Sequence, residues 1–175
     1  ALLVAAMAAE TDAIWIGRDL GYRGGRRTGL ALTDDIHLSN HAVRWNVELS
    51  RATIGEPVAE RTAAVIWRLL DLIDSRIFLW NVFPFHPHEP KDPFTNRAHS
   101  SQERGVGEEF LSQLIDILRP SHIIALGNDA YASAGRVAGD IPITAVRHPS
   151  YGGQAIFDRQ IRDFYSSSMR SDRLL

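Results

Sequence analysis

The sequence contains no cysteine among its 175 residues. This absence excludes a disulfide scaffold, a zinc or iron–sulfur site with cysteine ligands, and catalysis by a thiol. The sequence also lacks any run of about 18 apolar residues, which a helix needs to span a bilayer. Its formal net charge is only −2, so no overall positive field attracts a polyanion. Any contact with nucleic acid must therefore come from a local basic patch.

Lysine is almost missing as well, because all but Lys91 of the 19 basic residues are arginine. Guanidinium groups suit bidentate contacts to phosphate, although the bias is equally explained by genome composition. The composition of 45% hydrophobic and 23% charged residues is typical of a globular domain. The apolar residues 1–9 carry no basic flank, which favours part of a core element over a signal peptide. We expect one domain over residues 1–175, monomeric, cytoplasmic and without membrane contact.

Short apolar runs alternate with amphipathic stretches along the chain. The runs predict strands at Ala13–Gly17, Ile77–Val82, Ile123–Leu126 and Ile143–Val146. Their nearly continuous apolar character is typical of parallel strands buried on both faces. The predicted fold class is therefore α/β, a three-layer α/β/α arrangement around a central four-stranded parallel sheet.

Helices are predicted between these strands from apolar positions at helical spacing. One begins at Pro57 and runs for about fifteen residues, and another covers Glu108–Leu118. A short alanine-rich helix follows the turn at residues 127–129, where a side-chain cap is expected, and the last helix covers about Ala155–Tyr165. The residues expected to be buried on the last two long helices include Phe110, Ile156 and Phe164.

Unusual polar residues follow three of the four predicted strands. Residues 17–29 hold five glycines and four arginines, Asn81 ends the second strand, and residues 147–153 follow the fourth strand. The third strand ends without comparable chemistry at residues 127–128. In a parallel sheet, ligands bind beyond the carboxyl ends of the strands, where these segments converge.

Each of these features also has a simpler interpretation. A glycine-rich turn is often only a turn or a phosphate loop, and Asp19 would cap a helix or pair with an arginine. His148 would fit a capping or core role. A metal site built from His86, His88 and His99 is a further alternative, but their spacing lacks the helical i, i+4 arrangement that directs two imidazoles at one ion.

Taken together, the motifs resemble those of the uracil-DNA glycosylase superfamily. The first is Gly-Arg-Asp-Leu-Gly at residues 17–21 and the last is His-Pro-Ser at residues 148–150. Between them, WNVFPFHPHEP, TNRAHSSQE and LRPSHIIALGNDA are similar to the middle of bacterial members. The resemblance extends from Ile14 to the last helix.

The resemblance implies a base excision repair enzyme that hydrolyses the N-glycosidic bond of deoxyuridine in DNA. It would release free uracil, leave an abasic site, and require no metal or organic cofactor. Asp19 would position or deprotonate water and stabilise the sugar cation, and His148 would stabilise the departing base. Asn81 would recognise uracil, because an amide has both a donor and an acceptor.

The remaining site residues are also implied by the resemblance, since the base must leave the duplex to reach such groups. The residues implied in substrate binding are Gly17, Arg18, Gly21, Tyr22 and Leu32. The residues implied in DNA binding are Arg23, Arg26, Arg27, Arg147, Ser150, Tyr151, Gly152 and Gly153, with Tyr151 as the candidate wedge.

The sequence departs from the pattern of the family at several positions. Leu20 replaces the usual proline, Gly21 stands where strict members have a tyrosine that excludes thymine, and Leu32 replaces the aromatic residue that stacks on uracil. Phe83 and Phe85 are the nearby aromatic candidates for that stacking. The departures leave two alternatives open: a glycosylase for hypoxanthine or mismatched thymine, and a non-catalytic DNA-binding relative.

Overall fold

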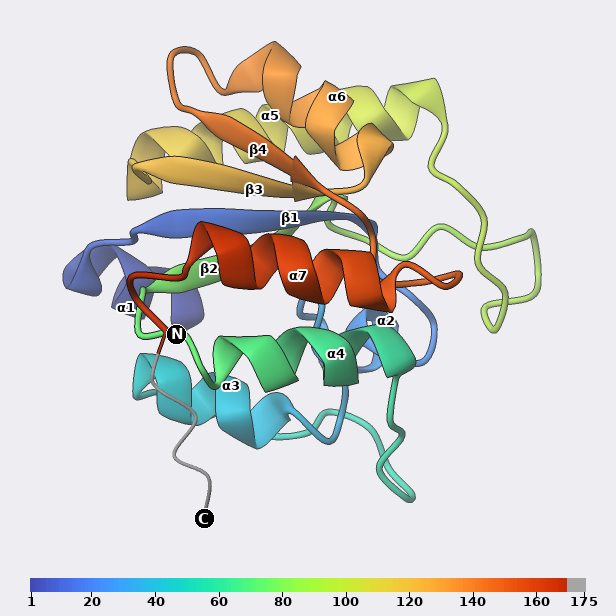
Figure 1. Ribbon diagram of the computed structural model, residues 1–175. Helices are drawn as coiled ribbons and strands as arrows, with labels where there is room; N and C mark the ends of the chain where they lie inside the picture. The colour runs from blue at the N-terminus through green and yellow to red at the C-terminus, as the bar shows by residue number, and fades with distance from the viewer. Residues whose placement is uncertain (170–175) are drawn as a thin grey trace.

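The computed structural model describes residues 1–169 and contains a four-stranded sheet (Figure 1). Its strands are β1 (Ala13–Asp19), β2 (Ile77–Phe83), β3 (His122–Leu126) and β4 (Ile143–Val146). They pair in the order β2-β1-β3-β4, and every pairing is parallel. The predicted α/β class and the parallel sheet are confirmed.

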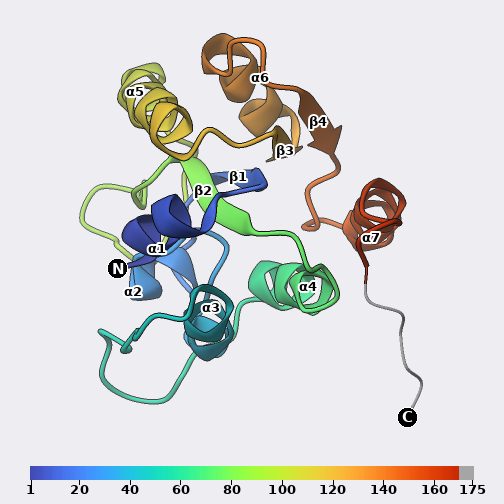
Figure 2. The same ribbon diagram turned by 90° about the vertical axis from the view of Figure 1, so that its left-hand side faces the viewer.

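Helices cover both faces of this sheet. Figure 2 shows α5 and α6 on one side of the strands and α4 and α7 on the other. The helices of the described residues are α1 (Leu2–Ala9), α2 (Gly25–Thr28), α3 (Leu38–Trp45), α4 (Arg61–Leu70), α5 (Ser101–Leu118), α6 (Asn128–Val137) and α7 (Gln154–Phe164). The sequence prediction missed α2 and α3, which lie in a stretch dominated by polar residues, and assigned residues 1–9 to no particular element.

Alternate side chains of β1 enter two separate cores. Trp15 points toward α4 and α7, where its ring meets Phe157 edge-on and its Nε1–H donates to the Tyr165 hydroxyl at 3.0 Å. Ile14 and Ile16 point toward α5 and α6 on the opposite face. This alternation is the period-2 pattern of a strand, with both faces buried because helices lie on each.

The predicted start of α4 at Pro57 was wrong, because the helix begins at Arg61. Two backbone N–H groups just before it are held by carboxylates from a distant loop. The N–H of Val58 donates to Asp35 at 3.0 Å, and the N–H of Glu60 donates to Asp34 at 2.5 Å. These bonds keep the chain extended up to Glu60.

Helix α5 begins seven residues earlier than predicted, at Ser101. Ser100 and Glu103 form a reciprocal capping box that starts it. Gly107 is required by packing, because a Cβ there would lie 2.1 Å from the Val82 carbonyl oxygen. The helix therefore rests directly on β2.

Three residues expected in the core are substantially exposed instead: Phe110 by 41%, Ile156 by 44% and Phe164 by 39%. Each lies at the margin of its helix's buried stripe, and the neighbouring layer does not extend over it. The side-chain cap expected at the turn before α6 was also wrong, since Gly127 is the N-cap and Asn128 is already helical.

No helix within residues 1–169 is both long enough and apolar enough to cross a membrane.

Candidate active site at the carboxyl edge of the sheet

A cavity of about 450 Å³ opens where β1, β3 and β4 end. Asp19, Leu32 and His148 line it together, although they come from separate segments of the chain. Gly127 and Asp129 also line it, so the third strand end, for which no role was predicted, contributes to the site. This convergence follows from the parallel sheet, which brings all carboxyl ends to one edge.

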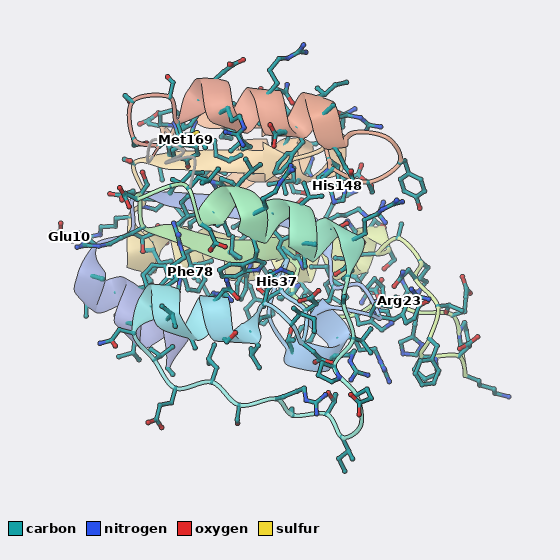
Figure 3. The ribbon with its side chains drawn as sticks, turned by 60° about the horizontal axis from the view of Figure 1, so that its bottom comes forward. Glu10, Arg23, His37, Phe78, His148 and Met169 are labelled. Carbon is teal, nitrogen blue, oxygen red and sulfur yellow. The ribbon has the colours of Figure 1, made fainter. Side chains whose placement is uncertain are left out.

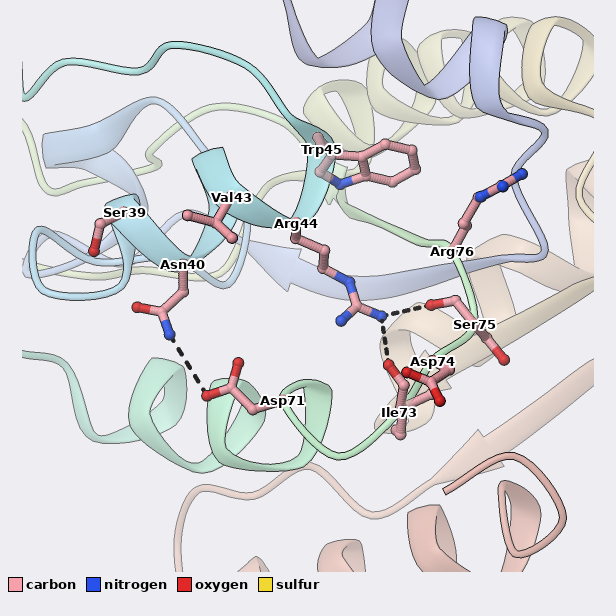
Figure 4. A pocket seen from close by; sticks show the side chains of 10 residues that line it. All are labelled: Ser39, Asn40, Val43, Arg44, Trp45, Asp71, Ile73, Asp74, Ser75 and Arg76. Carbon is pink, nitrogen blue, oxygen red and sulfur yellow. Dashed lines mark hydrogen bonds between the residues drawn. The ribbon is translucent and has the colours of Figure 1, made fainter. Parts of the chain in front are cut away.

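A second cavity, of about 560 Å³, lies beside the amino end of β2 (Figure 4). Its central side chain is Arg44, which donates to the carbonyl oxygens of Leu70 at 2.8 Å and Ser75 at 2.5 Å. Arg44 thus satisfies the carbonyls where α4 ends, which is a structural role. None of the predicted site residues lines this cavity.

Asp19 is the last residue of β1, and its carboxylate is held from two sides. Oδ2 accepts a hydrogen bond from Arg18 Nε at 2.7 Å, and Oδ1 is in contact with His99 Nδ1. The side chains of Asp19 and His99 are each only 8% exposed. Arg18 also reaches Asp129, at 3.4 Å. The carboxylate is therefore fixed in orientation at the cavity wall.

His99 is the main residue whose role the sequence analysis missed. It was considered only as a metal ligand, and 80 residues separate it from Asp19. The two meet because residues 84–99 cross the carboxyl edge of the sheet before α5 begins. The available signal was a histidine in a loop that follows the end of a strand.

The three histidines of the alternative metal site do not converge. His86 directs Nδ1 at the Leu20 carbonyl oxygen (2.7 Å) and Nε2 at that of Pro93 (3.2 Å). His88 stacks on His86, and His99 is engaged with Asp19. Within residues 1–169 no three His, Cys, Asp or Glu side chains are grouped so that they could hold a metal ion.

His148 follows β4 and is oriented by the next loop. Its Nδ1 accepts the backbone N–H of Ser150 at 3.2 Å and lies 2.7 Å from the hydroxyl of the same residue. A backbone N–H can only donate, so the proton of the neutral ring is on Nε2. Burial lowers the pKa of His148 to about 4, with help from the positive charges of Arg18 and Arg147. Near neutral pH the ring is a neutral N–H donor.

The low pKa of His148 has a counterpart in His41, and together they predict a pH-dependent stability. Burial lowers the pKa of His41 from 6.5 to about 4, with a smaller effect from Arg44. Below pH 6.5 these two histidines bind protons in the unfolded chain but stay neutral in the folded chain. The free energy of unfolding should therefore fall between pH 6.5 and pH 4. Each ring contributes on the order of 3 kcal/mol.

Urea denaturation at several pH values measures this dependence. The H41Q variant should show a shallower loss of stability over the same pH window, because one of the two groups no longer titrates. Identical slopes for the wild type and H41Q would contradict the assignment to His41.

Asn81 lies next to the cavity but does not line it. It is 1% exposed, and within the described residues its amide nitrogen and oxygen have no hydrogen-bond partner. A Cβ at Gly17 would lie 2.4 Å from Asn81 Oδ1 and 3.0 Å from Leu32 Cδ2. Glycine at position 17 thus leaves room for the amide, and a ligand reaches it only after neighbouring side chains such as Leu32 shift.

The arginines predicted to bind DNA have different surroundings. Arg147 and Arg18 line the cavity, while Arg23 bonds to the Tyr22 hydroxyl and Arg26 lies over an exposed aromatic ring. Figure 3 shows Arg23 and His148 at the same end of the molecule. Arg27 instead forms a part-buried pair with Asp35 at 2.6 Å. Its predicted contact to phosphate would require that pair to break.

The loop after His148 projects an aromatic side chain from the cavity rim. Tyr151 is 97% exposed, with a left-handed backbone (φ 50°), and Gly152 follows with φ 77°. The N–H of Gly153 donates to the Ser150 carbonyl oxygen at 3.0 Å, which closes the loop. A side chain at position 153 is excluded, because its Cβ would lie 2.1 Å from the His148 carbonyl oxygen.

Two findings define the class of this protein as a DNA glycosylase, a hydrolase of DNA repair. The first is the parallel sheet with a carboxylate and a proton donor in one cavity at its edge, and the second is the sequence comparison. The model of the family described as the uracil DNA glycosylase superfamily matches residues 8–164, and the chain belongs to this superfamily. Among solved structures, wild-type SMUG2 of Pedobacter heparinus is similar in fold, with a TM-score of 0.60 and 16% sequence identity. The similarity covers 90% of this chain and 76% of that chain. No curated protein matches by sequence.

Proposed function

We propose that this DNA glycosylase removes uracil from DNA by hydrolysing the bond between N1 of the base and C1′ of the deoxyribose. The observation that carries the proposal is that Asp19 and His148 line the same cavity, one as an anion and the other as a neutral N–H donor. Breaking the bond leaves positive charge on the sugar and negative charge on the base. The two groups have the chemistry to stabilise both charges at once.

On the sugar side, the Asp19 carboxylate offsets the developing cation. Water adds its oxygen to C1′ and gives a proton to this carboxylate. Arg18 and His99 hold the carboxylate in place, so little reorganisation is needed as the charge develops.

On the base side, the electron pair of the broken bond passes to uracil. His148 Nε2–H donates to the O2 atom, where the negative charge gathers. A neutral donor suits this role. Because the pKa of the ring is low, the ring is not protonated on Nδ1, and its Nε2–H stabilises the departing base by a hydrogen bond. Asn81, with both amide groups unpaired, would meet O4 and N3–H of the same base.

Around the cavity, the DNA backbone would be held by Arg147, Ser150 and the backbone of Gly152. The base must be extruded from the stack to enter the cavity, and the exposed Tyr151 is placed to fill the space that it leaves. Because the arginines contact phosphate, affinity should fall as the salt concentration rises.

Single-turnover excision from labelled oligonucleotides tests the proposal directly. Oligonucleotides carrying uracil, thymine opposite guanine, or hypoxanthine are compared, and the abasic product is cleaved with alkali. We expect uracil to be released fastest, without added metal and in the presence of a chelator. No release of uracil from single-stranded or duplex DNA would overturn the proposal.

A second candidate, excision of another base, is favoured by two lining residues. Gly21 has no side chain of its own, although Glu60 Oε1 lies 3.4 Å from the position of a Cβ there, and Leu32 offers an aliphatic surface instead of an aromatic ring. The same panel of oligonucleotides distinguishes this candidate, because it predicts that thymine or hypoxanthine is released faster than uracil. A non-catalytic DNA-binding relative would bind the oligonucleotides and release none of the three bases.

A further inference from the structure

Glu60 places a second carboxyl group in the cavity wall, and neither the predicted site nor the mechanism uses it. The residue immediately precedes α4 and lines the cavity with Asp19 and His148. Its backbone is anchored, because its N–H donates to Asp34 at 2.5 Å. Its side-chain carboxyl, by contrast, forms no hydrogen bond or ion pair within residues 1–169. The backbone of Glu60 is thus held in place, and its carboxyl is left unpaired.

Two glycines make the room for this carboxyl. A Cβ at Gly24 would lie 2.1 Å from Glu60 Oε2 and 3.1 Å from Cδ, and a Cβ at Gly21 would lie 3.4 Å from Oε1. Any side chain at position 24 would therefore displace the carboxyl. The glycine-rich loop after β1 therefore accommodates the side chain of Glu60.

Such an arrangement lowers stability rather than raising it. Burial raises the pKa of Glu60, and the nearby negative charge of Asp34 adds to the effect. Glu60 is partly exposed and lines the cavity, so a base that enters the cavity would displace water from the carboxyl and would have to supply a partner for it. A ligand bound in the cavity would be that hydrogen-bond partner.

We propose that Glu60 is a substrate-recognition residue whose carboxyl hydrogen-bonds to the nucleotide held in the cavity; the inference rests on the proposed function. A carboxylate accepts an N–H or O–H, and a protonated carboxyl also donates to a carbonyl oxygen. Uracil and thymine offer the carboxyl the same N–H and C=O groups, because the methyl group of thymine replaces only a C–H. Glu60 therefore recognises the polar edge that the two bases share, and the contact contributes to the excision of both.

The test compares three variants in single-turnover excision of uracil and of thymine opposite guanine. E60L should lower excision of each base that the wild type releases at least about tenfold, because a hydrogen bond to the substrate is lost. E60Q keeps a polar group of the same shape that can still donate and accept, and it should retain most of the activity. E56Q is the matched control, since Glu56 is exposed on the same segment and its replacement makes the same change in charge.

Thermal unfolding separates recognition from a structural role. Removing an unpaired carboxyl should leave the Tm of E60L and E60Q unchanged or raise it, whereas loss of a structural group would lower it. Excision of uracil by E60L within about threefold of the wild type would overturn the inference, as would a lower Tm in both Glu60 variants. If wild type and E56Q both fail to excise uracil, the proposed function itself fails, and the inference fails with it.

Discussion

Replacing Asp19 with asparagine (D19N) is expected to slow single-turnover excision of uracil by about 10²- to 10⁴-fold. Asparagine has nearly the same shape as aspartate, so the pocket should keep its form. It can neither offset the positive charge of the sugar nor accept the proton of water. The rate is measured with saturating enzyme, so that weaker binding of DNA does not contribute to the loss.

The control for this prediction is D129N. Asp129 also pairs with Arg18, at 3.4 Å, but its side chain is 65% exposed. Exposed pairs contribute little, so D129N should stay within about threefold of the wild type. A loss below about tenfold in D19N, or about 1.4 kcal/mol of barrier, would show that Asp19 does not have the assigned role.

Replacing His148 with alanine (H148A) is expected to lower the excision rate by about 10²- to 10³-fold, the usual effect of removing one donor to a developing anion. Because the pKa of His148 is about 4, the imidazole stays neutral between pH 6 and pH 8. The titration of this ring should therefore leave the wild-type rate unchanged across that range. Excision rates of both proteins over the range check the two expectations together.

H88A is the matched control for H148A, because it removes an imidazole from a loop at the same edge. His88 stacks on His86 outside the cavity. We expect H88A to keep near wild-type rates. Equal losses in H88A and H148A would indicate that histidine removal damages the fold, and activity in H148A close to the wild type would contradict the role of His148 as donor to the base.

The strands were predictable because their signal is local and strong. A strand buried on both faces is apolar at nearly every position, so Ile143–Val146 was predicted with its observed bounds, and β1 was only extended by two residues. Helix starts were less predictable. The start of α4 depends on Asp34 and Asp35, carboxylates more than twenty residues away, whose hydrogen bonds hold the preceding segment extended.

The position of the cavity at the carboxyl edge of the sheet was predictable, and so was the presence there of two of its lining residues. Polar residues at the ends of parallel strands meet at one edge, so Asp19 and His148 were expected near each other, and both line one cavity. Their partners were not predictable from spacing. His99 reaches Asp19 through a loop whose path depends on its packing across the sheet.

The sequence by itself determined the α/β class, the parallel sheet and the edge at which the polar residues gather, because hydrophobic periodicity reports burial within each segment. Only the tertiary structure decided which charges meet. It paired Arg27 with Asp35, placed His99 against Asp19, and seated the carboxyl of Glu60 against Gly24. These choices depend on how separate loops pass one another at the edge of the sheet, and no local pattern in the sequence records those paths.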